Sequence, residues 1–297
     1  MRKVLLTFVI IFVSIYVVFS FLGRKSDYVL EKKLWKINQE LGEYAKDPLS
    51  VPDRAFIEVA ERCNALVSKY DQSRLKPVLR ITSARAYMYA KEYKTAREQL
   101  ELVISENKEN QMMGSQALAD IGRTYALEEN SEAVLATYQR MLNEFPLTSL
   151  GLSTPLYIAK YYADKGLLAK ASSAYDNAVL HYQKIADEHK GTLLGINAQK
   201  LIGTCYNAQQ KWDEAINIFK EILLESPPEL MTIQSSSAVV RSVNRVAIVK
   251  LNSFDIPIEI YEEFIKRNPG HELNPHFQSL IDGFIELKNK NVKVKTK

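Results

Sequence analysis

The residues best suited to catalysis or metal binding, histidine and cysteine, are few in this chain and are not grouped. The histidines are His181, His189, His271 and His276, and the cysteines are Cys63 and Cys205. His181 and His189 lie eight residues apart, without the glutamate of an HExxH zinc motif. The cysteines lack the CxxC spacing of a metal or redox pair. Both lie among apolar residues at helical spacing, so we interpret them as small buried side chains.

Motifs of nucleophilic and nucleotide chemistry are also absent from the sequence. It contains no GxSxG elbow, no Walker A loop and no GxGxxG turn, and no pair of carboxylates is singled out by its spacing. The formal net charge is only +4, with no pattern of a known nucleic-acid-binding module. We therefore predict a protein that is not an enzyme, with no cofactor, no metal and no nucleic acid as partner.

The composition favours long helices. The chain has 297 residues, of which 46% are hydrophobic, and it contains only 11 glycines and 10 prolines. Scarce turn residues argue against an all-β architecture, and the apolar content is sufficient for a packed core. We expect an all-α protein.

An apolar run near the N-terminus differs from the rest. Residues 4–22 contain no charged side chain, and as a helix they would be about 28 Å long, close to the thickness of a bilayer's hydrocarbon core. Gly23 follows the run, so a lipoprotein signal is absent, and the one tolerable cleavage site lies inside the run. We predict an N-terminal transmembrane helix at 4–22, after a head at 1–3, that remains as a signal-anchor.

Two features of the sequence bear on the orientation of this span, and they favour opposite sides of the membrane. More Lys and Arg residues follow the span than precede it, which favours a cytoplasmic C-terminal side. The short basic head, with Arg2 and Lys3, is typical of an exported bacterial anchor. We predict a single-pass protein of the cell inner membrane with its main domain in the periplasm.

A pattern of small, aromatic and proline residues recurs along the rest of the chain. In the clearest copy the series is Gly203, Tyr206, Ala215, Phe219 and Pro227. The same offsets give Gly122, Tyr125, Tyr138 and Pro146; Ala159, Tyr162, Ala171 and Tyr175; and Ala84, Tyr87 and Ala96. A degenerate copy follows Arg245. Such repetition predicts stacked helix hairpins in which small residues allow close helix contacts, aromatics fill the gaps and proline ends the second helix.

This pattern resembles the tetratricopeptide repeat, over most of residues 77–271. The resemblance implies a right-handed superhelical solenoid of helix hairpins, with repeats at about 77–110, 115–148, 152–190, 196–229 and 238–271. The long interval before Gly191 predicts a second helix extended by about two turns. Segments such as Phe145–Ser149 are similar to the turns between repeats of bacterial envelope members of the family.

Helices at both ends are expected to cover the repeats. Residues 26–76 contain two apolar patterns of helical period, which predict N-terminal capping helices or a degenerate repeat. Residues 274–288 predict a C-terminal capping helix, and 289–297 form a lysine-rich tail that we expect to be solvated.

The resemblance also implies a binding groove. In the family, the residue after the small position faces a concave groove formed by the first helices of the repeats. Here these residues are Arg85, Arg123 and Lys160, with Met88 and Tyr89 nearby. They predict a basic wall for an acidic segment of a partner protein. The alternative interpretation is three ordinary surface charges.

The function that these features favour is protein binding. We predict a membrane-anchored scaffold for protein–protein interactions in cell-envelope assembly or protein export. Two alternatives stay open: a periplasmic assembly factor released by signal cleavage, and a non-catalytic accessory subunit of a membrane enzyme complex.

Overall fold

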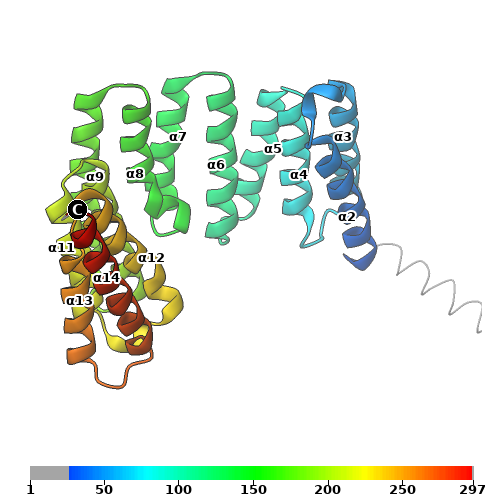
Figure 1. Cartoon of the computed structure of the whole chain (residues 1–297). Helices are drawn as coiled ribbons and strands as arrows, with labels where there is room; N and C mark the ends of the chain where they lie inside the picture. The colour runs from blue at the N-terminus through cyan, green and yellow to red at the C-terminus, as the bar shows by residue number, and fades with distance from the viewer. Residues whose placement is uncertain (1–26, 296–297) are drawn as a thin grey trace, which may run out of the picture. The chain divides into compact units, whose positions relative to one another are not determined.

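The computed structural model describes residues 27–295, and the side chains of residues 27–290. This range contains thirteen α-helices and no strand (Figure 1), which confirms the all-α prediction for these residues. The predicted transmembrane helix at 4–22 lies outside them. In the described part of the chain no helix is long and apolar enough to span a bilayer. The right-handed superhelix stays a prediction.

The described residues form two compact units, which divide between Gly151 and Leu152. The helices of the first unit are α2 (Asp27–Tyr44), α3 (Asp53–Lys69), α4 (Lys76–Tyr89), α5 (Tyr93–Glu106), α6 (Gln111–Leu127) and α7 (Ser131–Glu144). A 3₁₀ turn at Pro48–Ser50 joins α2 to α3. From α3 to α7, each helix packs against the next one in the chain (Figure 1).

The second unit begins within α8 (Ser149–Asp164). It continues with α9 (Leu168–Glu188), α10 (Leu193–Ala208), α11 (Trp212–Glu225), α12 (Ile233–Asn244), α13 (Asp255–Arg267) and α14 (Asn274–Lys295). A π-helical turn at Arg245–Lys250 follows α12. Helix α9 has 21 residues against 14 in α11, two turns more, which confirms the predicted extension.

The same turn recurs in four of the helix hairpins. Its residue in the left-handed region lies seven positions after the small residue of each copy, at Lys91, Glu129, Gly166 and Gln210, with φ of 60°, 57°, 71° and 61°. The next residue donates its backbone N–H, over 2.9 Å, to the carbonyl of the tyrosine in that copy. The tyrosine position therefore marks where the first helix ends and the chain reverses.

The small residues lie where two helices meet. A side chain at Gly203 would place its Cβ 2.5 Å from Cε1 of Phe219, so α10 and α11 touch through the bare glycine backbone. At Gly122 the nearest atom is Cγ2 of Thr137, at 3.2 Å, rather than the ring of Tyr138. Thr137 is buried and Tyr138 is half-buried. The α6–α7 contact is therefore made one residue earlier than the aromatic position of the pattern.

At the remaining positions of the repeat pattern, burial depends on the size of the side chain. The alanines are buried, at Ala84, Ala96, Ala159, Ala171 and Ala215. Tyr175 is buried, whereas Tyr87, Tyr125, Tyr162 and Tyr206 are half-buried, as are Pro146 and Pro227. The small side chains therefore lie inside the core, whereas most of the tyrosines pack against it and remain partly exposed.

The last helix is longer than the sequence predicted. We expected it to end at 288, followed by a frayed tail, but α14 continues to Lys295. No glycine or proline lies between 288 and 295, and lysine is a good helix former. The helix consequently has no local signal to end where the apolar pattern does.

Candidate functional site

A pocket of about 470 Å³ lies in the first unit, between α4, α5 and α6. It is lined by Arg85, Met88, Tyr89, Lys91, Tyr93, Arg123 and Leu127; we call it the α4–α6 pocket. Residues 85, 88 and 89 lie on one face of α4, and residues 123 and 127 on one face of α6, because side chains three and four apart share a helix face. The lining therefore combines three cations with apolar surface.

Four of the five predicted binding residues lie around this pocket. Arg85, Met88 and Tyr89 come from α4 and Arg123 from α6. The fifth, Lys160, is exposed on α8 in the second unit. The role of all five in partner binding stays a prediction.

A buried carboxylate, which the sequence reasoning missed, links the two arginines. Asp120 lies one turn before Arg123 on α6, and its exposed fraction is 0%. Its Oδ1 is 3.4 Å from Nη1 of Arg123, and its Oδ2 is 3.8 Å from Nη2 of Arg85. Neither carboxylate oxygen accepts a hydrogen bond from any described residue. Asp120 is thus compensated by charge alone, through two cations on two helices.

This arrangement changes what the basic pair can do. Both arginine side chains remain half exposed or more, while one nitrogen of each guanidinium lies within 4 Å of Asp120. Because a guanidinium has five N–H donors, each arginine keeps donors for a second anion. With one negative and two positive charges, and Lys91 also at the pocket, the cluster retains a positive charge that favours an anionic group. The signal in the sequence was the acidic residue within the otherwise small and apolar stretch from Ala117 to Gly122.

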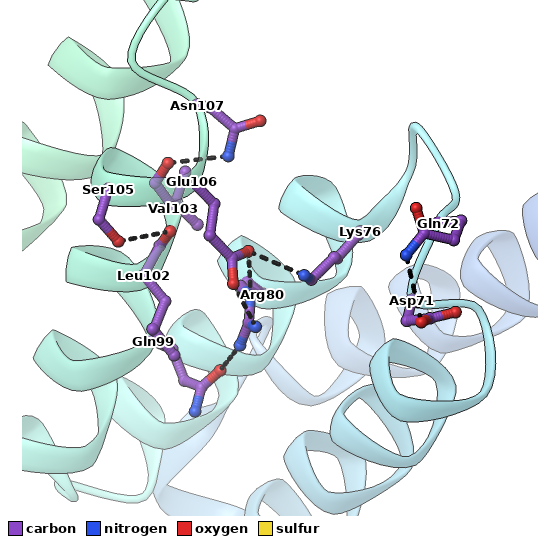
Figure 2. Close-up of polar contacts among 10 residues, drawn as sticks. All are labelled: Asp71, Gln72, Lys76, Arg80, Gln99, Leu102, Val103, Ser105, Glu106 and Asn107. Carbon is purple, nitrogen blue, oxygen red and sulfur yellow. Dashed lines mark hydrogen bonds and ion pairs between the residues drawn. The ribbon is translucent and has the colours of Figure 1, made fainter.

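A second polar cluster joins α4 to α5 (Figure 2). Glu106 accepts hydrogen bonds from Arg80, over 3.0 and 3.2 Å, and lies 3.2 Å from Nζ of Lys76. Arg80 also donates to Gln99 over 3.2 Å. Partial burial would raise the pKa of Glu106, but the hydrogen bonds from Lys76 and Arg80 outweigh it and hold the pKa below its ordinary value. The satisfied donors indicate a structural clamp rather than a binding site.

The two cysteines are separate, buried and free. Burial raises the pKa of each thiol to about 12, so both are protonated at neutral pH. Their interpretation as small core side chains is confirmed. In the described residues no group of three or more His, Cys, Asp or Glu side chains is arranged to hold a metal ion.

Comparison with known proteins identifies one of the hairpins. Residues 201–228 match the family model of the tetratricopeptide repeat, which confirms the resemblance for the clearest copy of the pattern. This segment comprises the second half of α10 and all of α11, including the contact between Gly203 and Phe219. No curated protein matches the chain. Repeats of this family typically form non-catalytic scaffolds for protein–protein interaction.

Proposed function

We propose, from the premise that the chain is a tetratricopeptide-repeat protein, that it is a membrane-anchored scaffold that binds acidic segments of partner proteins. The observation that carries this proposal is the α4–α6 pocket, where Arg85 and Arg123 share the buried carboxylate of Asp120. The Asp120 carboxylate lies near both arginines but leaves their solvent-facing N–H groups available as hydrogen-bond donors. An anionic side chain of a partner can therefore bind without first displacing a hydrogen-bonded neighbour.

The apolar part of the pocket supplies the rest of the recognition. Exposed ion pairs each contribute only about 0.2–1 kcal/mol, so two arginines alone would bind weakly. Met88, Tyr89 and Leu127 offer apolar surface beside the charges. A partner segment with an acidic residue next to an apolar one satisfies both halves of the lining.

Capture experiments test the binding proposal. The direct change of both arginines to glutamate is uninformative, because it leaves Asp120 buried beside new negative charge. The triple variant Arg85→Gln, Asp120→Asn and Arg123→Gln removes the cations and their counter-charge together. We expect affinity capture from membranes to lose the partners of the wild-type chain. The variant Lys94→Gln with Lys108→Gln removes two exposed charges of the same unit elsewhere and should retain them. Equal capture by all three proteins would refute the pocket as the binding site.

The anchor is the second part of the proposal. It is supported by the uncharged run at 4–22, and we propose an inner-membrane protein with its repeats in the periplasm, acting in envelope assembly or export. We expect the protein to resist extraction of membranes with carbonate. A mature N-terminus near Phe21 would instead indicate the released periplasmic form. A cysteine placed in the tail and probed with a membrane-impermeant thiol reagent would determine the orientation.

A further inference from the structure

One face of α2 presents aromatic and basic side chains to solvent. Leu30, Leu34, Ile37 and Leu41 of this helix are buried in the core of the first unit. Tyr28, Lys32 and Trp35, spaced by four and three residues, lie on the opposite side and form one stripe. The exposed fractions of Tyr28 and Trp35 are 73% and 58%, the largest of any aromatic side chain in the described residues.

The charge around this stripe is positive. Lys32 and Lys36 are exposed and form no ion pair with any described residue. The two acidic residues at the start of the helix, Asp27 and Glu31, are 3.4 and 3.3 Å from the guanidinium of Arg74 on the turn before α4. The nearby negative charge is therefore compensated, and the lysines are free to attract an anionic surface.

The position of α2 in the chain limits what can cover this face. The predicted membrane span ends at Leu22 and α2 begins at Asp27. Five peptide steps reach at most about 18 Å. The polar headgroup layer occupies several ångströms beyond each side of the hydrocarbon core. The start of α2 therefore lies no more than about 18 Å beyond the hydrocarbon core, close to the headgroup layer, where tryptophan and tyrosine are enriched and lysines attract acidic lipids.

We propose that the stripe of Tyr28, Lys32 and Trp35, flanked by Lys36, binds the headgroup surface of an anionic membrane. The proposal rests on the proposed anchor, which brings the helix to the bilayer. In this arrangement the aromatic rings enter the interfacial layer and the lysines bind acidic lipid headgroups. The opposite, buried face of α2 packs against the rest of the first unit. The span and the helix together would fix the orientation of that unit relative to the bilayer, which a single flexible tether would not do.

Tryptophan fluorescence of the full chain tests this contact. The chain has two tryptophans, Trp35 and Trp212, so the variant Trp212→Phe leaves Trp35 as the only reporter. We would reconstitute it into vesicles of phosphatidylcholine and phosphatidylglycerol that contain lipids brominated on the acyl chain. Flotation of the vesicles reports the anchor independently. The expected result is co-flotation, loss of Trp35 emission to the brominated lipid, and protection of Trp35 from acrylamide in the water.

Two controls separate the stripe from the rest of the unit. Moving the reporter to α5, with Leu102→Trp in a chain that also carries Trp35→Phe and Trp212→Phe, should give emission quenched by acrylamide and not by brominated lipid. Lys32→Glu with Lys36→Glu, in the Trp212→Phe chain, should reduce quenching by brominated lipid in the anionic vesicles. The same reversal at Lys94 and Lys108 should not. In vesicles of phosphatidylcholine alone the two lysine variants should differ little.

Each other result has a defined meaning. Co-flotation with Trp35 fully accessible to acrylamide would overturn the contact and leave the anchor intact. Co-flotation with Trp35 shielded from both quenchers would indicate a protein neighbour, such as a second copy, and would also overturn it. Failure to float would overturn the anchor, and with it the lipid contact. Equal quenching at Trp35 and at the α5 reporter would show that the stripe has no special position.

Discussion

Helices α6 and α10 open two hairpins with the same small residue at their centre, yet they use the surrounding positions differently. Two residues before the glycine, α6 has Asp120 and α10 has Leu201; one residue after it, α6 has Arg123 and α10 has Thr204. Asp120 is fully buried and accepts no hydrogen bond from the described part of the chain, whereas Leu201 is a half-buried apolar side chain. The α10 hairpin is the one that matches the family model.

The difference between Asp120 and Leu201 indicates that the α10 hairpin is optimised for packing, whereas the α6 hairpin is suited to binding. Burying a carboxylate costs free energy unless it is well paired, and an apolar side chain at that position is often equally good or better for stability. The α10 hairpin therefore follows the choice that serves folding. In α6 the same position is Asp120, whose carboxylate keeps Arg85 and Arg123 at the α4–α6 pocket. A cost in stability at this position is explained if the pocket binds a ligand.

The largest effect is expected from the packing side of this comparison. Gly203→Leu should lower the stability of the protein by on the order of 1–3 kcal/mol or more, because its side chain would overlap the buried ring of Phe219. Thermal denaturation monitored by circular dichroism measures the loss. Gly283→Leu is the control, since a Cβ there has no neighbour within 4 Å. Equal melting temperatures for the two variants would mean that the α10–α11 contact is misplaced.

Substitutions at the α4–α6 pocket should change stability in a different way, through the charge of Asp120. Arg85→Gln with Arg123→Gln leaves Asp120 buried without a cation and should cost about 1–3 kcal/mol. Adding Asp120→Asn should recover most of that loss, because the uncompensated charge is then gone. Chemical denaturation of the three proteins gives the comparison. If the arginine variant is as stable as the wild type, the carboxylate does not depend on the pair.

The clamp at Glu106 predicts a dependence on pH. Its pKa is lowered in the folded protein, so its contribution to stability is present above the ordinary value of 4.5 and disappears as the pH falls below it. Glu106→Gln should cost about 1 kcal/mol at neutral pH, since a charged acceptor is replaced by a neutral one. The difference from the wild type should shrink when denaturation is repeated on the acid side of pH 4.5. A difference independent of pH would contradict this account.

The smallest effect is expected at the recurring turn. Lys91, Glu129 and Gln210 adopt a left-handed conformation that favours glycine, the residue found at the matching position 166. Changing Glu129 or Gln210 to glycine should stabilise the protein by about 0.5–1 kcal/mol, and Gly166→Ala should destabilise it by a similar amount. Melting temperatures should move in these opposite directions. Shifts of the same sign would show that the four turns are not equivalent.

The helix contacts made by the small residues of the repeat could be predicted from the sequence. Small residues at Gly203 and Ala215 indicated helix contacts because only a few side chains fit there. The turn was not predicted, because lysine, glutamate, glycine and glutamine have nothing in common except a backbone angle imposed by the packed helices on either side.

The pocket was predicted only in part. Residues such as Arg85 and Met88 were inferred from the repeat register, which also proposed Lys160 of the other unit. Asp120 was missed because a buried carboxylate cannot be distinguished from a surface one by residue type alone. Its partner Arg85 is distant in the sequence, and only the fold brings the two together.

The most direct test of the central claim compares the two hairpins at one matched position. Leu127 at the pocket and Ala208 on α10 each lie five residues after the glycine of their helix, and both are exposed. A photoreactive amino acid would be placed at either position in the full chain, and crosslinked partners would be identified from membranes. We expect crosslinks at Leu127 to an acidic segment, lost at high salt and in the triple variant of Arg85, Asp120 and Arg123, and none at Ala208. Crosslinks of equal yield at both positions, unaffected by salt or by the triple variant, would contradict the assignment of binding to the α4–α6 pocket.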